Sequence, residues 1–408
     1  MAEAVDIAIV GAGPAGLAAA CAALRAGAKT VIVLDREAEA GGIPRSCAHS
    51  PFGMREFHRV LGGRAYAKRL VEQARREGAD IRTGVHVVRL DPGGAMAVST
   101  SEGMSVLSAR RVILATGARE TPRPARLIPG ERPFGVMTTG ALQNFVHIEK
   151  RKPFEQPAIV GTELVGFSAI LTALLAGMRP AAMIERADAP VARWPSALLP
   201  KALHIPLILG AEIADIVGRE QVEAIVVKTA QGARRVDCDG VVFTGRFTPA
   251  AELVRQSHLA FDPATGGPII DQFGRCSDSA YFAAGNLLRP IETAGWSWAE
   301  GSRVGEAAMR DLMGRLPPAP RRVTVSFGRA LSYVVPQLLT PLESSAGLGA
   351  LQMRASRAGV GHLTLSADGL VLARRRVSAR LERRILLPLA GLRIPSDASR
   401  LLVSLEEA

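Results

Sequence analysis

Close to its start the chain carries a glycine-rich turn between two apolar runs, and this turn limits the possible folds more than any other part of the sequence. Residues 6–10 (DIAIV) are an uninterrupted apolar run, as expected for a strand buried on both faces of a parallel sheet. The turn GAGPAG occupies residues 11–16, and a segment of small residues typical of a helix follows at 17–27. A second apolar run, TVIVLD, closes the unit at 30–35. This order of strand, turn, helix and strand is the setting in which G-x-G-x-x-G binds a dinucleotide.

Each glycine of this turn has its own physical task. Gly11 permits the tight turn, Gly13 lets the backbone approach a pyrophosphate, and Gly16 lets the helix pack closely on the strand. The helix N-terminus then faces the negative charge. Asp35, at the end of the second strand, can accept a hydrogen bond from a ribose hydroxyl, and an acidic residue there argues against a 2′-phosphate. We assign three more residues to this nucleotide site: Pro14, Ala15 and Arg36.

A second unit of the same kind begins at residue 158, but its turn is altered. The stretch AIVGTELVGF (158–167) places Glu163 where the middle glycine is expected. A carboxylate adds bulk, and two like charges about 4 Å apart repel by ~4 kcal/mol at an effective dielectric of about 20. Against a micromolar affinity of about −8 kcal/mol, this is a severe loss. We therefore expect the unit to keep its fold and to have lost NAD(P). Glu185, at the end of its second strand, could have served a ribose, or it is equally a relic or a surface charge.

The order of the apolar runs indicates two nested α/β units. Further strands are expected near 222–229 and 241–245, and YFAAGN (281–286) begins a strand and helix that return to the first unit. Residues 164–178 are apolar nearly all round and shorter than the ~20 residues that span a bilayer, so we expect a helix buried in a sheet layer. The predicted fold is α/β, with two nested Rossmann-like dinucleotide-binding domains.

A proline-rich stretch, GRLPPAPRR at 314–322, separates a third region from these two. Beyond it, apolar and polar residues alternate, and ADG at 367–369 lies between two such runs as in a β-hairpin. We predict a small C-terminal β-rich domain over 321–408. The other predicted boundaries are 1–140 with 246–315 for the first dinucleotide domain, and 141–245 for the inserted, degenerate one.

Composition narrows the classes of function. The formal net charge is +12, but the basic residues are dispersed and aromatic residues make up only 4%, so we expect no nucleic-acid binding. Contact with a membrane surface stays open, whereas no transmembrane segment and no signal peptide are expected. No C-x-x-C motif is present, so we expect no metal site, and the wide cysteine spacing fits a reducing cytoplasm. The cysteines are Cys21, Cys47, Cys238 and Cys276.

Three later segments resemble those of a known class of flavoprotein. ILATGARE (113–120) and VVFTGRFTP (241–249) look like its two matching strand ends, and YFAAGN (281–286) looks like the segment that meets the ribityl chain of FAD. Over most of residues 5–310 the chain resembles the glutathione reductase and thioredoxin reductase-like flavoproteins. The resemblance implies that the first site binds FAD. It also implies FAD contacts from Val87, Ala115, Thr116, Gly117, Gly285, Asn286, Thr293 and Ala294.

The chain departs from this family at Asn286, where an aspartate is usual. An amide oxygen can still accept from a ribityl hydroxyl, but without the assistance of a charge. Residues 291–308 read as a helix whose first turn, at Thr293 and Ala294, would face the flavin and stabilise negative charge on the reduced ring. An ordinary amphipathic helix is the alternative.

The loop GGIPRSCAHSPFG (41–53) follows the second strand, where this class places residues beside the flavin. Gly42 would let the chain pass the pyrophosphate, and Arg45 would lie near the phosphates or an anionic substrate. Cys47 and His49 are the candidate catalytic residues. A thiolate could form a flavin adduct or a charge-transfer pair, with His49 lowering its pKa. The alternatives are a small buried cysteine and a histidine that only holds the loop.

Five segments in this order resemble a narrower bacterial subgroup: GGIPRSCAHSPFG, GRAYAKRL, ATGARETPRP, GVMTTGALQNFV and AAGNLLRPIETAG. The subgroup contains the A subunits of opine oxidases, the B subunit of hydrogen cyanide synthase and the α subunit of sarcosine oxidase. The resemblance implies an oxidoreductase that works with a partner dehydrogenase subunit. Some of these relatives carry a C-terminal cysteine cluster for iron–sulfur, whereas this chain has no cysteine after Cys276.

Three functions stay open on the sequence. The preferred one is an FAD-dependent electron-transfer subunit of an amine, amino-acid or glycerol-3-phosphate-type dehydrogenase complex, reduced by a small-molecule substrate or a redox partner. The alternative is an NAD(P)H-dependent reductase of a thiol, peroxide or quinone that uses Cys47 and binds NAD(P) despite Glu163. The third is a non-catalytic assembly subunit stabilised by FAD.

Overall fold

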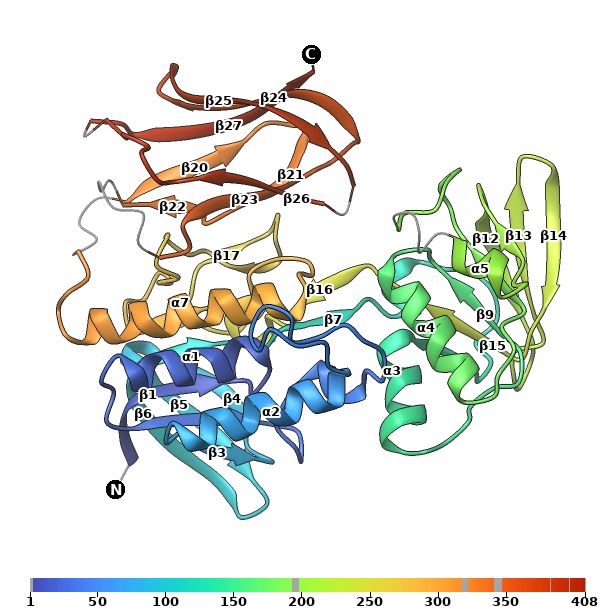
Figure 1. Cartoon of the computed structure of the whole chain (residues 1–408), viewed down its shortest axis with the longest axis horizontal. Helices are drawn as coiled ribbons and strands as arrows, with labels where there is room; N and C mark the ends of the chain where they lie inside the picture. The colour runs from blue at the N-terminus through green and yellow to red at the C-terminus, as the bar shows by residue number, and fades with distance from the viewer. Residues whose placement is uncertain are drawn as a thin grey trace.

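The computed structural model describes residues 3–192, 198–317, 322–340, 347–381, 383–395 and 397–407. Figure 1 shows three bodies of secondary structure, coloured blue with gold, green to yellow, and orange to red. A two-stranded ribbon, β7 (Ala118–Glu120) with β16 (Phe247–Pro249), joins the first body to the second. Residues 318–321 of the predicted proline-rich boundary lie outside the described residues.

The first sheet carries the N-terminal glycine turn. Its strand order is β3-β2-β1-β6-β5-β4, with β19 beside β6. β1 pairs in parallel with β2 on one side and with β6 on the other, so the chain leaves β1 at a topological switch point, where ligands bind in such folds. The strands are β1 (Glu3–Val10), β2 (Val31–Asp35), β3 (Asp80–Thr83), β4 (His86–Asp91), β5 (Ala95–Thr100), β6 (Gly103–Leu114) and β19 (Tyr281–Ala283).

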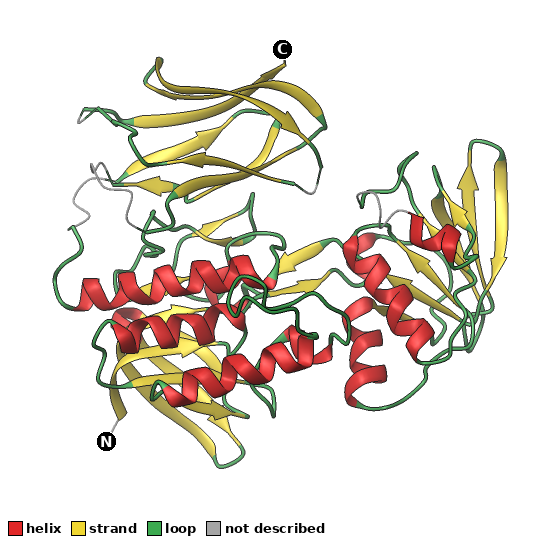
Figure 2. Ribbon diagram, in the orientation of Figure 1, coloured by secondary structure: helices red, strands yellow, loops and turns green. Residues whose placement is uncertain are grey.

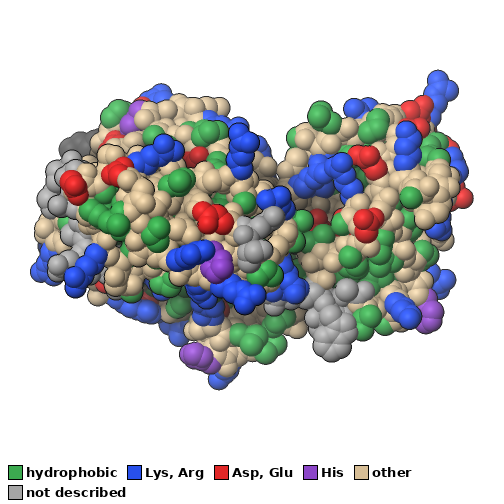
Figure 3. Space-filling view, turned by 90° about the horizontal axis from the view of Figure 1, so that it is seen from above, with side chains coloured by type: hydrophobic (Ala, Val, Ile, Leu, Met, Phe, Trp, Pro, Cys, Tyr) green, Lys and Arg blue, Asp and Glu red, His purple; other side chains and the backbone are tan. Residues whose placement is uncertain are grey.

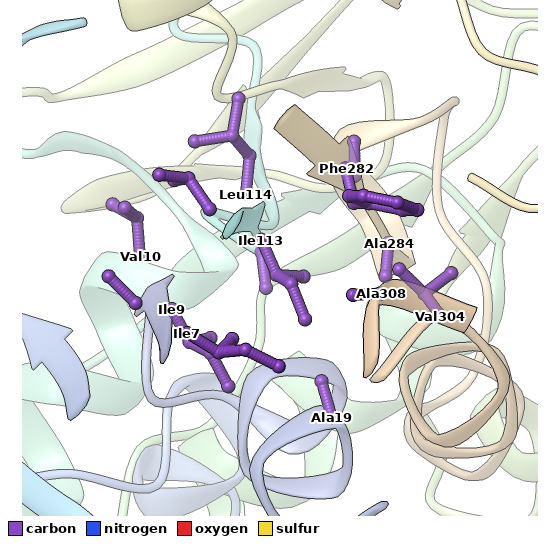
Figure 4. Packing of buried hydrophobic residues seen from close by; sticks show 14 of the residues in the cluster. Ile7, Ile9, Val10, Ala19, Ile113, Leu114, Phe282, Ala284, Val304 and Ala308 are labelled. Carbon is purple, nitrogen blue, oxygen red and sulfur yellow. The ribbon is translucent and has the colours of Figure 1, made fainter. Parts of the chain in front are cut away.

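Two helices, α1 (Pro14–Arg25) and α7 (Ala294–Leu312), lie side by side on this sheet (Figures 1 and 2). Their contact is very close, because a Cβ added at Gly301 of α7 would lie 2.0 Å from the carbonyl oxygen of Ala15 in α1. This spacing explains why the segment after the glycine turn is built from small residues. Figure 4 shows side chains from both helices packed with those of β1, β6 and β19 in one apolar core.

The second body contains a parallel sheet in the order β11-β10-β9-β15-β8 and an antiparallel sheet in the order β12-β13-β14. β9 lies between β10 and β15, which repeats the switch point of the first sheet. The sheet also includes β8, which precedes the boundary expected at residue 141. The elements are β8 (Val136–Thr138), α3 (Thr139–Gln143), β9 (Pro157–Val160), α4 (Leu164–Leu175), β10 (Ala182–Ile184), α5 (Leu199–Ala202), β11 (Leu207–Ile208), β12 (Glu212–Val217), β13 (Ala224–Thr229), β14 (Gly232–Asp237) and β15 (Gly240–Phe243).

The helix α4 is only partly buried, although its sequence predicts burial all round. Leu164 and Leu175 expose 65% and 70% of their surface, and Leu171 and Leu174 are also exposed. The residues on the other side of the helix are fully buried in the core beneath it. The difference arises because the sheet covers one side of the helix only. We call these four side chains the leucine face.

The third body is a β-sandwich, which confirms the predicted β-rich domain. Its sheets have the orders β22-β20-β27-β24-β25 and β21-β23-β26, with apolar side chains of both between them. The predicted hairpin joins β24 to β25, and its turn residues Asp368 and Gly369 have φ of 45° and 94°, as a tight hairpin turn requires. The strands are β20 (Val323–Phe327), β21 (Leu331–Val335), β22 (Leu338–Leu339), β23 (Ala350–Ala355), β24 (Gly359–Ala367), β25 (Leu370–Ala379), β26 (Arg384–Pro388) and β27 (Arg400–Glu407).

Short elements complete the chain. They are the 3-10 turns η1 (Ile43–Ser46), η2 (Pro92–Gly94), η3 (Arg123–Arg126) and η6 (Gly285–Leu287), the π-turn η4 (Asn144–Ile148), the helices α2 (Gly63–Arg76) and α6 (Glu252–Arg255), and the strands β17 (Phe261–Asp262) and β18 (Gly267–Pro268). Within the described ranges, none of the helices combines the length and the apolar character needed to span a membrane. The two parallel sheets with helices packed on them confirm the predicted α/β fold class.

Candidate functional site

The N-terminal turn has the geometry that its glycines predict. Gly11 has φ of +109°, and its N–H donates to the carbonyl of Leu34 over 2.8 Å. A Cβ at Gly11 would lie 2.4 Å from the carbonyl oxygen of Ala115, and one at Gly16 would lie 1.9 Å from that of Gly11. These two positions therefore have no room for a side chain, and they bring β1, β6 and α1 together.

The middle glycine differs from its neighbours, because it faces open space. A Cβ at Gly13 would meet no atom within 4 Å, and the same is true at Gly117. Gly42 lies directly against the turn, since a Cβ there would be 2.8 Å from the Cα of Gly13. Pro14 is the first residue of α1, so the free N–H groups of that helix end border the same space. The residues present therefore fit a dinucleotide pyrophosphate at this helix end.

Asp35 is buried beside this turn. Its two carboxylate oxygens accept the N–H groups of Ala12 (2.7 Å) and Glu37 (2.9 Å), which leaves the second lone pair of each oxygen for a ribose hydroxyl. The Asp35 carbonyl accepts the N–H of Val85 over 3.0 Å, which brings the start of β4, with Val87, beside the same strand end. Arg36 points outward, with 71% of its side chain exposed.

The A-T-G segment connects the first sheet to the ribbon between the bodies. The Ala115 N–H donates to the Val10 carbonyl over 2.8 Å, at the end of β1. The Thr116 hydroxyl donates to the Ala250 carbonyl (2.8 Å), and the Ala250 N–H donates to the Gly117 carbonyl (2.9 Å). The segment therefore lies directly beside the glycine turn, since Ala115 is the residue that a Cβ at Gly11 would meet.

The loop between β19 and α7 explains why an asparagine replaces the usual aspartate. The Asn286 Oδ1 accepts the Glu292 N–H (2.8 Å), while its Nδ2 donates to the Glu292 carbonyl (3.2 Å). Only an amide can make both bonds, because a carboxylate has no hydrogen to donate. Gly285 has φ of +75°, and Thr293 and Ala294 form the N-cap and first residue of α7. A ribityl contact from Asn286 stays a prediction.

Arg45 is held by acidic neighbours in the loop after β2. Its guanidinium pairs with Glu39 over 3.2 Å and lies 4.0 Å from Glu37. Its Nε is buried and has no hydrogen-bond partner among the described residues. The proposed contact of Arg45 with a phosphate or an anionic substrate stays a prediction, and it would compete with these two carboxylates.

Cys47 is buried, with 7% of its surface exposed, and its thiol lies 3.5 Å from the amide oxygen of Gln143 in α3. The Gln143 amide in turn donates to the Ser168 hydroxyl in α4 over 2.7 Å. Burial, followed by the nearby Glu120 carboxylate, raises the pKa of Cys47 to about 12. The expectation that His49 lowers this pKa is therefore wrong, and the residue is a neutral thiol at neutral pH.

His49 lies in the same loop, with its ring centroid 5.2 Å from that of Phe52. Burial lowers the pKa of His49, so the imidazole is neutral as well. The catalytic roles of Cys47 and His49 stay predictions. Sequence reasoning missed Gln143, which connects Cys47 to the second body, and no local pattern marks it.

The second glycine turn copies the backbone of the first. Gly161 has φ of +123°, and its N–H donates to the Ile184 carbonyl over 2.8 Å. The two oxygens of Glu185 accept the N–H groups of Thr162 and Ala187, each over 3.0 Å. Glu185 thus holds the place that Asp35 holds in the first unit, and it is buried rather than a surface charge.

Glu163 fills the space that stays open at Gly13. Its Oε2 accepts the hydroxyl of Thr244 over 2.6 Å. A Cβ at Gly245 would lie 2.3 Å from its Oε1, and one at Gly161 would lie 2.6 Å from its Oε2. The carboxylate therefore lies between the glycine turn and the end of β15, at the switch point of the second sheet.

We call the two glycine turns, with the strand ends beside them, the first cradle (residues 11–16 and 115–117) and the second cradle (residues 161–166 and 244–245). Arg126 contacts the second cradle, and no pattern in the sequence indicates it. Its guanidinium donates to the carbonyls of Thr244 (2.9 Å) and Gly245 (2.7 Å), so it fixes the backbone that follows β15. Burial lowers the pKa of Arg126, an effect that the Glu163 carboxylate opposes. In the part of the chain that the structure describes, no group of His, Cys, Asp and Glu is placed to hold a metal ion.

Comparison with known proteins agrees with this geometry. Residues 5–301 match the family model of the pyridine nucleotide-disulphide oxidoreductases. The chain is 29% identical over 205 residues to an opine oxidase protein of Rhizobium meliloti (strain 1021), the A subunit, and the match covers 50% of this chain and 42% of the relative. It is 26% identical over 356 residues to the alpha subunit of sarcosine oxidase from Corynebacterium sp. (strain P-1), a match that covers 82% of this chain and 35% of the relative.

The chain thus spans less than half of the length of these two relatives. Among solved structures, the thioredoxin reductase of T. acidophilum superposes with a TM-score of 0.63 at 22% identity, over 76% of this chain and 99% of that one. This likeness concerns the fold alone. On the match over residues 5–301, the chain belongs to the pyridine nucleotide-disulphide oxidoreductase family and is an FAD-dependent oxidoreductase.

Proposed function

We propose that this chain is the flavoprotein subunit of a dehydrogenase or oxidase complex that oxidises an amine, an amino acid or a glycerol-3-phosphate-type substrate. In this function the FAD takes electrons from a partner protein of the complex and not from NAD(P)H. The observation that carries the proposal is the contrast between the two cradles. Gly13 leaves its turn open, whereas Glu163 fills the equivalent space.

Charge and space both argue against a pyridine nucleotide at the second cradle. A pyrophosphate would meet the Glu163 carboxylate, with a repulsion of ~4 kcal/mol at about 4 Å. Glu185 already accepts the N–H groups of Thr162 and Ala187 and the hydroxyl of Thr162, so little of its hydrogen-bonding capacity is left for a ribose. Both points favour an electron donor other than NAD(P)H.

At the first cradle, each residue has a task toward FAD. The backbone at Gly13 and the free N–H groups after Pro14 would hold the pyrophosphate, and Asp35 would accept from the adenosine ribose. The N-terminal turn of α7, after Thr293, would place its partial positive charge toward the flavin ring. When bound, FAD supplies the redox chemistry itself, so the proposed function needs no thiolate from Cys47, whose pKa is raised to about 12 by burial.

Three features support a partner protein. The opine oxidase and sarcosine oxidase relatives are named as subunits of oxidases. The leucine face leaves an apolar helix surface open, and such patches are typical of contacts with another protein. The net charge of +12, with Lys and Arg side chains spread over the face shown in Figure 3, favours an acidic partner over self-association.

We also propose a cytoplasmic location, since the four cysteines are unpaired.

The test is anaerobic mixing of the purified, FAD-loaded chain with NADH or NADPH, followed by the visible absorbance of the flavin. We expect no rapid bleaching with the wild type and a measurable gain with Glu163→Gly. Rapid bleaching of the wild type by either nucleotide would support the reductase alternative instead. A chain that keeps FAD but accepts electrons neither from nucleotide nor within its native complex would support the assembly role.

A further inference from the structure

The loop that joins β19 to α7 is hydrogen-bonded to a buried carboxylate of α7, that of Glu300. The N–H of Gly285 donates to Oε2 of Glu300 over 3.0 Å, and Glu300, in the second turn of α7, is only 5% exposed. The next residue, Asn286, fixes the far end of the loop through its two bonds to Glu292. Glu300 therefore sets the position of the backbone that is expected beside the ribityl chain.

The same carboxylate is bonded to the C-terminal sandwich. Its Oε1 accepts the side-chain amide of Gln352, in β23, over 3.1 Å. Gln352 is 6% exposed, so water competes little for this bond. A continuous path of two hydrogen bonds thus runs from Gln352 through Glu300 to Gly285. The family match ends at residue 301, so Gln352 belongs to a domain outside it.

A layer of buried charges reinforces this path. Arg289 is 1% exposed and lies 3.2 Å from Glu300. Glu292 lies 3.5 Å from Arg354 of β23 and 3.4 Å from Arg384 of β26. Two carboxylates of the loop and helix therefore face three guanidinium groups, two of which come from the sandwich. Loss of one partner in such a layer leaves an uncompensated buried charge, so these contacts hold the domain in a fixed place.

The first turn of α7 is also clamped. The guanidinium carbon of Arg384 lies 3.6 Å from the ring centroid of Trp296, and that of Arg55 lies 3.8 Å from the same centroid. Two groups this close to one centroid cannot share a face of the ring, so the indole is held between them. Arg55 comes from the first body and Arg384 from the third, so the helix end is fixed between both.

We infer that the C-terminal β-domain is a working part of the flavin site, with Glu300 and Gln352 as positioning residues for the loop at Gly285. The domain thereby sets how tightly the chain holds FAD and how the flavin is oriented. The inference rests on the flavin cradle and not on the proposed partner or electron donor. It can therefore fail while the proposed function stands, and the reverse.

The test compares Glu300→Gln and Gln352→Ala in the full chain with Glu306→Gln, an exposed residue of the same helix, as the matched control. The dissociation constant of FAD is measured by titrating the apoprotein, the visible circular dichroism reports the bound flavin, and hydrogen exchange reports the Gly285 amide. We expect both site variants to weaken FAD binding by roughly tenfold, as loss of a hydrogen bond to a charged group should. We also expect an altered flavin dichroism and faster exchange at Gly285, with Glu306→Gln unchanged.

The two site variants differ in how strongly they threaten the folding of the chain. Glu300→Gln leaves Arg289 without its nearest charge and can unfold the chain, whereas Gln352→Ala removes a neutral side chain. If Glu300→Gln does not fold, the Gln352→Ala result decides. A folded Gln352→Ala chain with wild-type FAD affinity, dichroism and exchange at Gly285 would overturn the inference, whatever NADH does to the flavin.

Discussion

The hydroxyl of Thr244 donates to Oε2 of Glu163 over 2.6 Å, across 81 positions of sequence. This bond holds a carboxylate inside the switch point of the second sheet, between the turn at Gly161 and the backbone at Gly245. A phosphate group bound there would need the same space. The second unit therefore holds a carboxylate in the space that stays open at Gly13 of the first unit.

Two variants separate the bulk of Glu163 from its charge. Glu163→Gln keeps the size and removes the charge, whereas Glu163→Gly removes both. We expect Glu163→Gly to gain affinity for NADH by up to about a thousandfold, the equivalent of the ~4 kcal/mol repulsion, and Glu163→Gln, which loses the same repulsion but keeps the bulk, to gain less than Glu163→Gly. Isothermal titration with NADH measures both. Equal, negligible binding by all three chains would show that the cradle is closed by something other than this side chain.

Alkaline pH should expose the state of Cys47. Its pKa is raised from about 9 in the unfolded chain to about 12 by burial, so the folded chain keeps a proton that the unfolded chain loses. The contribution is complete below pH 9 and is lost as the pH rises toward 12. At pH 10 the Cys47→Ser chain should lose less free energy of unfolding than the wild type, by roughly 1 kcal/mol, in urea titrations. At neutral pH the folded wild type should resist iodoacetamide, and rapid labelling of Cys47 would contradict the buried thiol.

The sequence predicted the parts of this molecule that depend on local pattern. Residues 6–35 fixed the first turn because strand, glycines and helix are contiguous, and the anomaly at Glu163 was visible for the same reason. The contacts of Cys47 with Gln143 and of Glu300 with Gln352 join residues 96 and 52 positions apart. Such pairs depend on how the bodies pack against one another, and the periodicity of apolar residues along the chain does not predict that packing. The open side of α4 was missed because an apolar helix looks the same whether or not a neighbour covers each face.

Replacement of Asn286 by aspartate should test why the chain departs from its family there. An aspartate still accepts the Glu292 N–H but cannot donate to the Glu292 carbonyl, and its charge would face that oxygen. We expect Asn286→Asp to lower the free energy of unfolding of the apoprotein by about 1–3 kcal/mol. Gln231→Glu, the same change from amide to carboxylate at an exposed turn, should change it by less than about 0.5 kcal/mol. An apoprotein as stable as the wild type after Asn286→Asp would show that the reciprocal pair is not needed.

The contact between α1 and α7 should be intolerant of a single methyl group. A Cβ at Gly301 would lie 2.0 Å from the carbonyl oxygen of Ala15, and that atom belongs to backbone, which cannot swing aside as a side chain does. Gly301→Ala must push the two helices apart, and we expect it to cost about 3 kcal/mol of stability. Because Ala15 lies within the glycine turn, two residues after Gly13, the shift also moves the backbone at Gly13, so bound FAD should fall with stability. Gly359→Ala is the matched control, since a Cβ there meets no atom within 4 Å. Thermal melts and the flavin-to-protein absorbance ratio measure both effects, and a Gly301→Ala chain with the stability and flavin content of Gly359→Ala would refute the close helix contact.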